Sequence, residues 1–372
     1  MRKLTPRSVL LGLAAPVGAL VFAAVVSAII LAVTGHAPTD AVDAMARAAE
    51  RPRTLVNAVN SATYYYLAAV AVAIGFRMKL FNIGVDGQYR LAALLSAALA
   101  GAAFMEQLPS FLRITVTIVV AMLVGAAWAG LAALLKVTRG VSEVISTIML
   151  NAVATYLVSY LNRPERLAVS TAGSNNIGTP KITEGGQVAG FTVEGSSSKL
   201  FGLIFLAAAV GVLYWFVLSR TRFGFELKAT GLSESAAVAS GVNVKKMVVL
   251  SMLLSGAVAG LVGMPQLLGS SYSYSLDFPA GLGFIGIAVA LLGRNHPIGM
   301  AIAALLWGFL ANTANSFDTS GIPREIVDIM QGVIVLSVVV AYELVRRYRV
   351  RAEQHAVGGA LGRTKTLEEV SS

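Results

Sequence analysis

The sequence contains no cysteine, and its only histidines are His36, His296 and His355. A chain without cysteine has neither disulfide bonds nor thiolate metal sites, and these histidines do not have the spacing of metal ligands. Charge is also scarce, because charged residues make up 13% of the 372 residues, against about 25% in a soluble domain. We therefore expect neither a metal site nor thiol chemistry.

Apolar residues dominate instead. They make up 56% of the chain, and the mean hydropathy is +0.74. This composition indicates a membrane protein that crosses the bilayer several times. The net charge of +10 comes from Lys and Arg residues that border apolar runs, which indicates orientation in a membrane rather than binding to nucleic acid.

A transmembrane helix needs about 20 apolar residues. The sequence predicts ten such spans, at residues 9–33, 54–76, 83–104, 112–135, 141–162, 200–219, 247–269, 276–293, 298–316 and 323–345. The fold class is therefore an all-α polytopic membrane protein. The apolar run 9–33 is about twice as long as a cleavable signal peptide core, so we expect it to remain as the first span. The eighth span contains Pro279 and several glycines, and is either broken or re-entrant.

The distribution of basic residues predicts the orientation. The loops on the side of the N-terminus carry 19 Lys and Arg residues, and those on the other side carry 9. Positive charge accumulates on the cytoplasmic side, so both termini are expected there. The expected organisation is a cytoplasmic N-tail 1–8, a transmembrane domain 9–345 and a cytoplasmic C-tail 346–372. The domain would include external segments 34–53 and 163–199, and a cytoplasmic loop 220–246.

The loop 220–246 contains the sequence of a short helix between Gly231 and Gly241. Ser233 is a favourable N-cap, Glu234 places a carboxylate in the first turn, and Gly241 suits the left-handed stop. The residues expected on its exposed surface are small, which would allow another protein to approach closely: Ala236, Ala237, Ala239 and Ser240. The alternative is an ordinary loop with one helical turn.

Residues 81–88, Phe-Asn-Ile-Gly-Val-Asp-Gly-Gln, begin the third span. Asn82 is a candidate cap of that helix, and Asp86 lies in or near its first turn. Gly84 and Gly87 offer a flat surface to a neighbouring helix. An ionisable residue in a span is a candidate functional group. Asp86 and Arg90 are also spaced to neutralise each other and fix helix packing.

A second dense motif occupies residues 281–297. Gly283 and Gly286 permit a close helix crossing or a break in the helix, and Pro297 suits the first turn of the next helix. We interpret His296 as a turn residue rather than a ligand.

Most polar residues within the spans are uncharged. Amide and aromatic side chains suit a neutral solute that stacks and hydrogen-bonds, whereas an ionic solute would need buried counter-charges. The candidate solute contacts are Asn57, Asn60, Tyr65, Asn151, Phe284 and Asn312. Each one taken singly is more typical of helix packing.

The sequence contains no P-loop, no catalytic triad and no paired carboxylates. We therefore expect a chain that is not an enzyme and holds no cofactor of its own.

Taken together, the motifs resemble those of permease subunits of bacterial ABC importers, over about residues 10–345. The most similar branch is the nucleoside permeases, which are related to permeases for ribose and other simple sugars and, more distantly, for branched-chain amino acids. The matching motif residues are Asn82, Gly84, Asp86, Gly87, Gln88, Gly283, Gly286, Arg294, Asn295 and Pro297. Two positions depart from that branch, which usually has Glu in place of Asp86 and Asn in place of Ser233.

The resemblance implies a multi-pass protein of the bacterial plasma membrane that pairs with a second permease chain. It also implies two separate ATPase subunits, which bind the ATP, and a solute-binding lipoprotein outside. The cytoplasmic helix would then be the coupling helix that docks to an ATPase. Its residues would be Gly231, Ser233, Glu234, Ala236, Ala237 and Gly241.

Three other hypotheses remain at this point. The first is an ABC permease for simple sugars such as ribose. The second is an ion-coupled secondary transporter, which usually has a carboxylate at the bilayer midplane, whereas Glu143, Asp328 and Glu343 lie near span ends. The third is a membrane enzyme, which the lack of a reactive constellation disfavours.

Overall fold

A computed structural model describes residues 6–170, 176–318 and 321–338, with a few further positions up to residue 347. The chain forms two compact units, residues 1–46 with 314–372 and residues 47–313, and the boundary falls within helices α2 and α13. The predicted tails 1–8 and 346–372 lie almost entirely outside the described residues.

The first unit contains α1 (Pro6–Val33), most of α2 (Pro38–Ala49) and a helical stretch at residues 325–338. Segment Val21–Val33 and α2 meet at an angle of 115° after a short break. The predicted external segment 34–53 therefore contains a helix, and Pro38 begins it, as suits a residue whose fixed φ is already helical.

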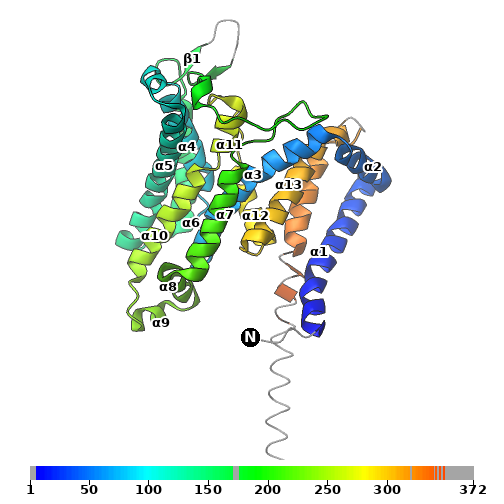
Figure 1. Cartoon of the computed structure of the whole chain (residues 1–372). Helices are drawn as coiled ribbons and strands as arrows, with labels where there is room; N and C mark the ends of the chain where they lie inside the picture. The colour runs from blue at the N-terminus through cyan, green and yellow to red at the C-terminus, as the bar shows by residue number, and fades with distance from the viewer. Residues whose placement is uncertain are drawn as a thin grey trace, which may run out of the picture. The chain divides into compact units, whose positions relative to one another are not determined.

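The second unit begins with α3 (Pro52–Phe76), α4 (Val85–Ala100), the 3₁₀ helix η1 (Ala103–Gln107), α5 (Ser110–Arg139) and α6 (Glu143–Leu161). It continues with α7 (Ile204–Arg220), α8 (Arg222–Leu232), α9 (Glu234–Ala239), α10 (Val244–Gly260) and α11 (Met264–Gln266). It ends with the π-helical turn η3 (Leu267–Ser271), α12 (Leu282–Leu292) and α13 (Pro297–Asp318). Figure 1 shows these helices in chain order.

Small residues allow the helices of the second unit to approach closely. Residues 67–73 of α3 are fully buried, and α3 contacts α7, α10 and α12. Helices α5 and α10 lie side by side (Figure 1), with a Cβ built on Gly125 only 2.2 Å from the Gly256 carbonyl oxygen. Helix association in a bilayer depends on such close van der Waals packing, because lipid is as apolar as the side chains.

Two opposite ends of the second unit carry its irregular segments (Figure 1). One end carries α8 and α9, and we call it the α9 end. The other carries the antiparallel hairpin of β1 (Val169–Ser170) and β2 (Ile177–Gly178), and we call it the β1 end. The predicted external segment 163–199 and the predicted cytoplasmic loop 220–246 are therefore at opposite ends, as the orientation requires.

The segment after the hairpin folds back onto η3 and onto the residues that follow it. The amide of Thr179 donates to Tyr274 (2.9 Å), that of Ile182 to Tyr272 (2.7 Å) and that of Val188 to Leu268 (2.9 Å). Backbone groups inside a membrane protein need such internal partners. This predicted loop is thus bound to the helices at the β1 end.

Among the described residues, five helices are long and apolar enough to cross a membrane, or seven if each of two bent pairs counts as one span. The expected eighth span is represented by α12, whose 11 residues rise by about 16 Å, about half of a bilayer core. Its start is broken, as Pro279 and the glycines suggested. The count of ten spans and the cytoplasmic location of the termini stay predictions.

Candidate functional site

Helix α9 is capped at both ends. The Ser233 hydroxyl accepts a hydrogen bond from the Ala236 amide (3.3 Å), and Glu234 lies in the first turn. At the other end Gly241 has a φ of +79°, which favours glycine. The Val242 amide donates to the Ala237 carbonyl (3.0 Å) and the Gly241 amide to the Val238 carbonyl (2.9 Å), which is a Schellman motif. The predicted caps are confirmed.

Two expectations about this helix are wrong. Ala237 is only 2% exposed, so its side chain packs inward and is not on the exposed surface of the helix, where it was expected. A helix of six residues shows too little periodicity for its buried face to be inferred from the sequence. Gly231 is not part of α9 but lies in the last turn of α8, where it is buried.

The exposed side of α8 and α9 carries large apolar side chains that the sequence analysis missed. Phe225, Leu232 and Val238 are 72%, 80% and 61% exposed. A contiguous group of exposed apolar side chains with polar residues around it is typical of a protein contact. The signal was present in the sequence as large apolar residues within the polar loop 220–246. We call Phe225, Leu232 and Val238, together with the exposed Ala236 and Ala239, the α8–α9 surface.

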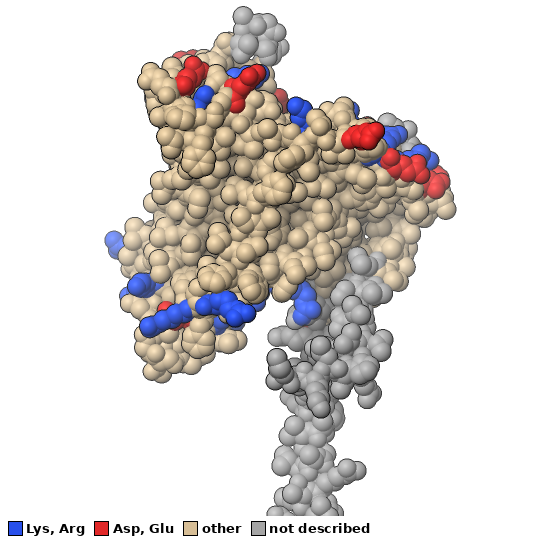
Figure 2. Space-filling view, in the orientation of Figure 1, with Lys and Arg blue, Asp and Glu red and all other residues tan. Residues whose placement is uncertain are grey.

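Basic residues surround this surface. Figure 2 shows Lys and Arg side chains gathered at the α9 end. The exposed ones on α7, α8 and α10 are Arg220, Arg222, Lys245 and Lys246. Arg222 forms an i,i+4 ion pair with Glu226 (2.6 Å). Positive charge beside an apolar surface suits contact with a partner at the cytoplasmic face of a membrane.

At Gly231 the backbone of α8 packs closely against the end of α3. A Cβ at Gly231 would lie 2.4 Å from the Arg77 carbonyl oxygen, so only glycine fits there. The Arg77 guanidinium donates to the Asn295 carbonyl (2.6 Å), and the Tyr214 hydroxyl donates to the same oxygen (2.8 Å). Asn295 lies in the turn after α12. These contacts link α8 to α12 through Arg77.

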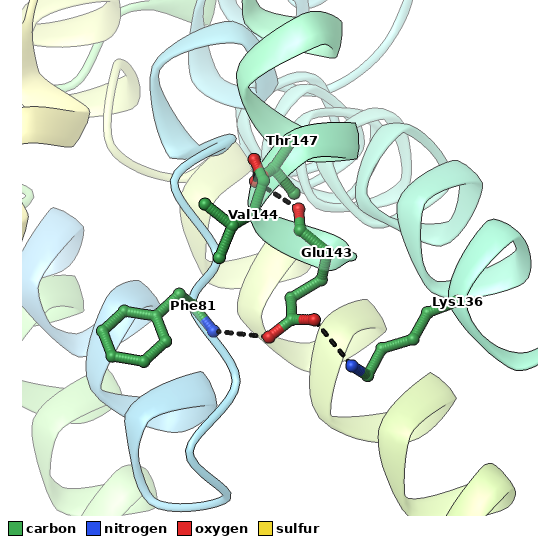
Figure 3. Close-up of polar contacts among 5 residues, drawn as sticks. All are labelled: Phe81, Lys136, Glu143, Val144 and Thr147. Carbon is green, nitrogen blue, oxygen red and sulfur yellow. Dashed lines mark hydrogen bonds and ion pairs between the residues drawn. The ribbon is translucent and has the colours of Figure 1, made fainter. Parts of the chain in front are cut away.

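Glu143, at the start of α6, joins three segments (Figure 3). Its carboxylate accepts from Lys136 Nζ (2.6 Å), near the end of α5, and from the Phe81 amide (3.4 Å) in the segment before α4. Glu143 is 7% exposed, so the carboxylate of this ion pair is buried, whereas the Lys136 side chain is 29% exposed. The sequence analysis treated Glu143 only as a residue near a span end.

Asn82 lies in a buried network. It is fully buried, and its side-chain amide donates to Gln88 Oε1 (3.0 Å) and to Ser255 Oγ of α10 (2.8 Å). The expectation that Asn82 caps the next helix is wrong, because the N-cap of α4 is Gly84. Asn82 Oδ1 instead accepts from the Gly84 amide (3.1 Å) and from Gln88 (3.0 Å), so Asn82 fixes the turn that leads into α4.

Asp86 contacts α12 and also interacts electrostatically with Arg90. It is 8% exposed, and its Oδ1 accepts from the Gly283 amide at 3.4 Å. A carboxylate is favourable at the positive end of a helix, and Asp86 lies in the first turn of α4 and beside the first turn of α12. The starts of α4 and α12 therefore meet at Asp86.

The motif glycines permit these approaches. A Cβ on Gly87 would lie 2.8 Å from that of Ala154 in α6, and a Cβ on Gly286 would lie 2.6 Å from that of Ala68 in α3. At Gly283 the Cβ would lie 2.4 Å from the Asp86 amide nitrogen. The predicted close helix crossings are therefore present at these glycines. The predicted break is also present, because α12 begins only at Leu282.

The turn between α12 and α13 also matches its prediction. Arg294 and Asn295 have left-handed φ values of +56° and +53°, and Pro297 begins α13. His296 is an exposed turn residue. Among the described residues no three His, Asp or Glu side chains group as metal ligands.

Most of the six candidate solute contacts are buried or half-buried within the chain. The amides of three of them are engaged inside the chain: Asn60 with Lys199 and Phe201, Asn151 with Ile83 and Gly87, and Asn312 with Ser61 and Gly308. Tyr65 is buried against Tyr64, and Asn57 is half-buried. Only Phe284 of this set is well exposed, by 54%.

A cavity of about 550 Å³ lies between α3, α7 and the start of α13. Its lining is mostly aliphatic, and its polar side chains are Thr63, Tyr66 and His296, with Trp215 at one side. It offers few hydrogen-bonding groups to a polar solute.

Comparisons with known proteins agree on one family. Residues 54–339 match the family described as "Branched-chain amino acid transport system / permease component". The chain is similar to the guanosine ABC transporter permease protein of Bacillus subtilis, with 35% identity over 77% of this chain and 81% of that protein. It is similar to the nucleoside ABC transporter permease protein of Lactococcus lactis, with 31% identity over 88% and 90%. It is also similar to the glucose ABC transporter permease protein of Haloferax volcanii, with 33% identity over 76% and 75%.

Proposed function

The chain belongs to the family of branched-chain amino acid transport system permease components, and we propose that it forms the translocation pathway of an ATP-driven importer for nucleosides. It is a multi-pass protein of the plasma membrane. Two similar permeases are named for guanosine and for nucleosides, and their alignments cover most of both chains. The similar glucose permease keeps simple sugars, such as ribose, as the alternative substrate class.

The observation that carries the proposal is the α8–α9 surface. A doubly capped helix presents small and apolar side chains at the α9 end, beside exposed basic residues. We propose that this surface docks to a separate ATPase subunit, which binds the ATP. This chain then has no ATPase site and no cofactor of its own. A second permease chain and a solute-binding lipoprotein complete the proposed assembly.

The contacts at the α9 end suggest how force would reach the junction of α4 and α12. A displacement of α8 moves Gly231 against the Arg77 backbone, because no gap separates them. Arg77 holds the Asn295 carbonyl, so the displacement passes to the end of α12. Helix α12 is continuous over its 11 residues, and its far end contacts Asp86. Movement of α12 would therefore change the junction of α4 and α12.

Reconstitution tests the proposal. The chain is placed in proteoliposomes with its ATPase and lipoprotein, and uptake of radiolabelled nucleosides is measured. Val238→Asp adds a charge to the α8–α9 surface and is expected to lower ATP-dependent uptake at least tenfold without changing the yield of folded protein. Val42→Asp, at a 64% exposed position of α2, is the matched control and is expected to retain uptake. Equal uptake by both variants would contradict the docking role.

The same uptake assay in proteoliposomes distinguishes the proposed nucleoside importer from a secondary transporter and from a sugar permease. An ion-coupled secondary transporter would take up solute from an ion gradient without the ATPase, and the proposal predicts no such uptake. A sugar permease would be revealed by ATP-dependent uptake of ribose or glucose with no uptake of nucleosides.

A further inference from the structure

The cavity between α3, α7 and the start of α13 is a partly open groove. Small side chains line its bottom, among them the buried Ala62 and Ala207. Val212 of α7 and Ile298 of α13 line it as well, and both are more than half exposed. None of the lining residues is Asp, Glu, Lys or Arg. In a membrane protein, exposed aliphatic side chains of this kind face lipid tails, which are as apolar as they are.

The groove follows only the first part of α13. This helix is long and apolar enough to cross a membrane, and the residues through which it lines the groove all lie between Pro297 and Leu305. That stretch rises by about 13 Å, close to half of the roughly 30 Å hydrocarbon core of a bilayer. The turn before α13 is linked through Arg77 to α8, at the α9 end. The groove therefore starts at the α9 end and has about the length of one layer of acyl chains.

Polar and basic side chains gather where the groove starts. His296 and Trp215 are exposed and line it there, and Tyr214, next to Trp215, donates to the Asn295 carbonyl in the turn before α13. The Arg220 guanidinium lies over Trp215, 5.7 Å from the centroid of its ring. Arg220 is exposed, and none of the ion pairs among the described residues includes it. An interfacial Trp beside an exposed basic side chain suits an anionic lipid headgroup.

We propose that this groove binds an anionic phospholipid of the inner leaflet, with one acyl chain between α7 and α13 and the phosphate beside Arg220 and His296. Arginine donates charge-assisted hydrogen bonds to phosphate oxygens, and an imidazole N–H is a further donor. The positive end of α13 adds to the attraction. The choice of leaflet rests on the proposed function, which places the α9 end in the cytoplasm, whereas the lipid site itself does not depend on it.

Photocrosslinking of the complete transporter in proteoliposomes tests this site. Phosphatidylglycerol and phosphatidylcholine with the same diazirine-bearing acyl chain are compared at equal mole fraction, and crosslinked peptides are identified by mass spectrometry. We expect phosphatidylglycerol to label residues 204–215 and 296–305 about fivefold more than phosphatidylcholine, the effect of one basic residue near an anionic headgroup. Arg220→Gln should reduce the labelling by phosphatidylglycerol to the level of phosphatidylcholine. Ala208→Phe, which fills the groove, should lower the labelling by both lipids.

The matched controls are Ala209→Phe, at an exposed alanine of α7 that does not line the groove, and Arg139→Gln, at the exposed end of α5. Both should label as wild type does. Equal labelling by the two lipids in wild type would overturn the proposal, as would an unchanged preference in Arg220→Gln. Labelling of the groove by neither lipid would show that another protein chain covers it, which also overturns the proposal. Neither ATP nor solute takes part, so a failure of nucleoside uptake and a failure of lipid binding are seen separately.

Discussion

Asp86 Oδ1 lies 3.4 Å from the amide nitrogen of Gly283, so one carboxylate serves the starts of two helices, α4 and α12. In transporters built from discontinuous helices, helix ends near the bilayer midplane are where solute sites form. Here the motif residues Asn82 and Gly87 lie in the same region, and Arg90 is one turn away. Residues of both sequence motifs therefore lie at or near the junction of α4 and α12.

Asp86→Ala is expected to lower the stability of the detergent-solubilised protein by about 0.5–2 kcal/mol, as for other lost helix caps. The Gly283 amide and the positive end of α12 would lose their acceptor. Thermal unfolding monitored by circular dichroism measures the change. Asp277→Ala, at an exposed carboxylate just before α12, is the control and should have little effect. Equal melting temperatures for Asp86→Ala and wild type would contradict the capping role.

Gly283→Ala should destabilise the protein by about 1–3 kcal/mol, because its Cβ would lie 2.4 Å from the Asp86 amide nitrogen and backbone cannot move aside locally. The matched change is Gly332→Ala, where a Cβ meets nothing within 4 Å. That change should be neutral or stabilise the helix by up to about 1 kcal/mol. Thermal unfolding of the two variants compares them directly. A smaller loss for Gly283→Ala than for Gly332→Ala would show that the two helices do not meet as described.

Arg77→Gln is expected to uncouple ATP hydrolysis from uptake. The variant cannot hold the Asn295 carbonyl while Gly231 still packs on the backbone of residue 77. We predict a lower number of nucleosides imported per ATP hydrolysed, by about threefold or more, with basal ATP hydrolysis retained. The exposed Arg139, which is also at a helix end, supplies the control variant Arg139→Gln. If Arg77→Gln imports as many nucleosides per ATP hydrolysed as wild type, Arg77 does not transmit movement from α8 to α12.

Glu143→Ala should cost about 1.5–3 kcal/mol, the range for hydrogen bonds to charged groups, because it removes the acceptor of both Lys136 and the Phe81 amide. Lys136→Ala should cost less, because Lys136 is the more exposed partner, with 29% side-chain exposure against 10%. A double-mutant cycle of these two variants measures the interaction free energy between Glu143 and Lys136. Additive effects would mean that the ion pair does not stabilise the fold.

Features that depend on residues close together in the sequence were predictable. Ser233 and Gly241 cap α9, and Pro297 begins α13, because each acts through backbone geometry within a few residues. The break before α12 could also be inferred, since Pro279 and glycine disrupt a continuous helix.

Features that depend on distant partners were not predictable. Asn82 looked like a helix cap, but its partner Ser255 is 173 positions away in the sequence. Asp86 was expected to interact with Arg90, but its contact with Gly283 on another helix could not be inferred from the sequence. The candidate contacts Asn60, Asn151 and Asn312 were chosen by residue type, which does not distinguish solute contact from the internal hydrogen bonds that they make.

The location of the α8–α9 surface is the most direct test of the account. The chain contains no cysteine, so single-cysteine variants carry no background label. Intact cells carrying Val238→Cys at the α9 end or Val169→Cys in β1 are treated with a membrane-impermeant maleimide. We predict labelling at position 169 from outside, and at position 238 only after the membrane is opened. Labelling of Val238→Cys in intact cells would place the α8–α9 surface outside the cell, where no ATPase can reach it, and would contradict the coupling mechanism.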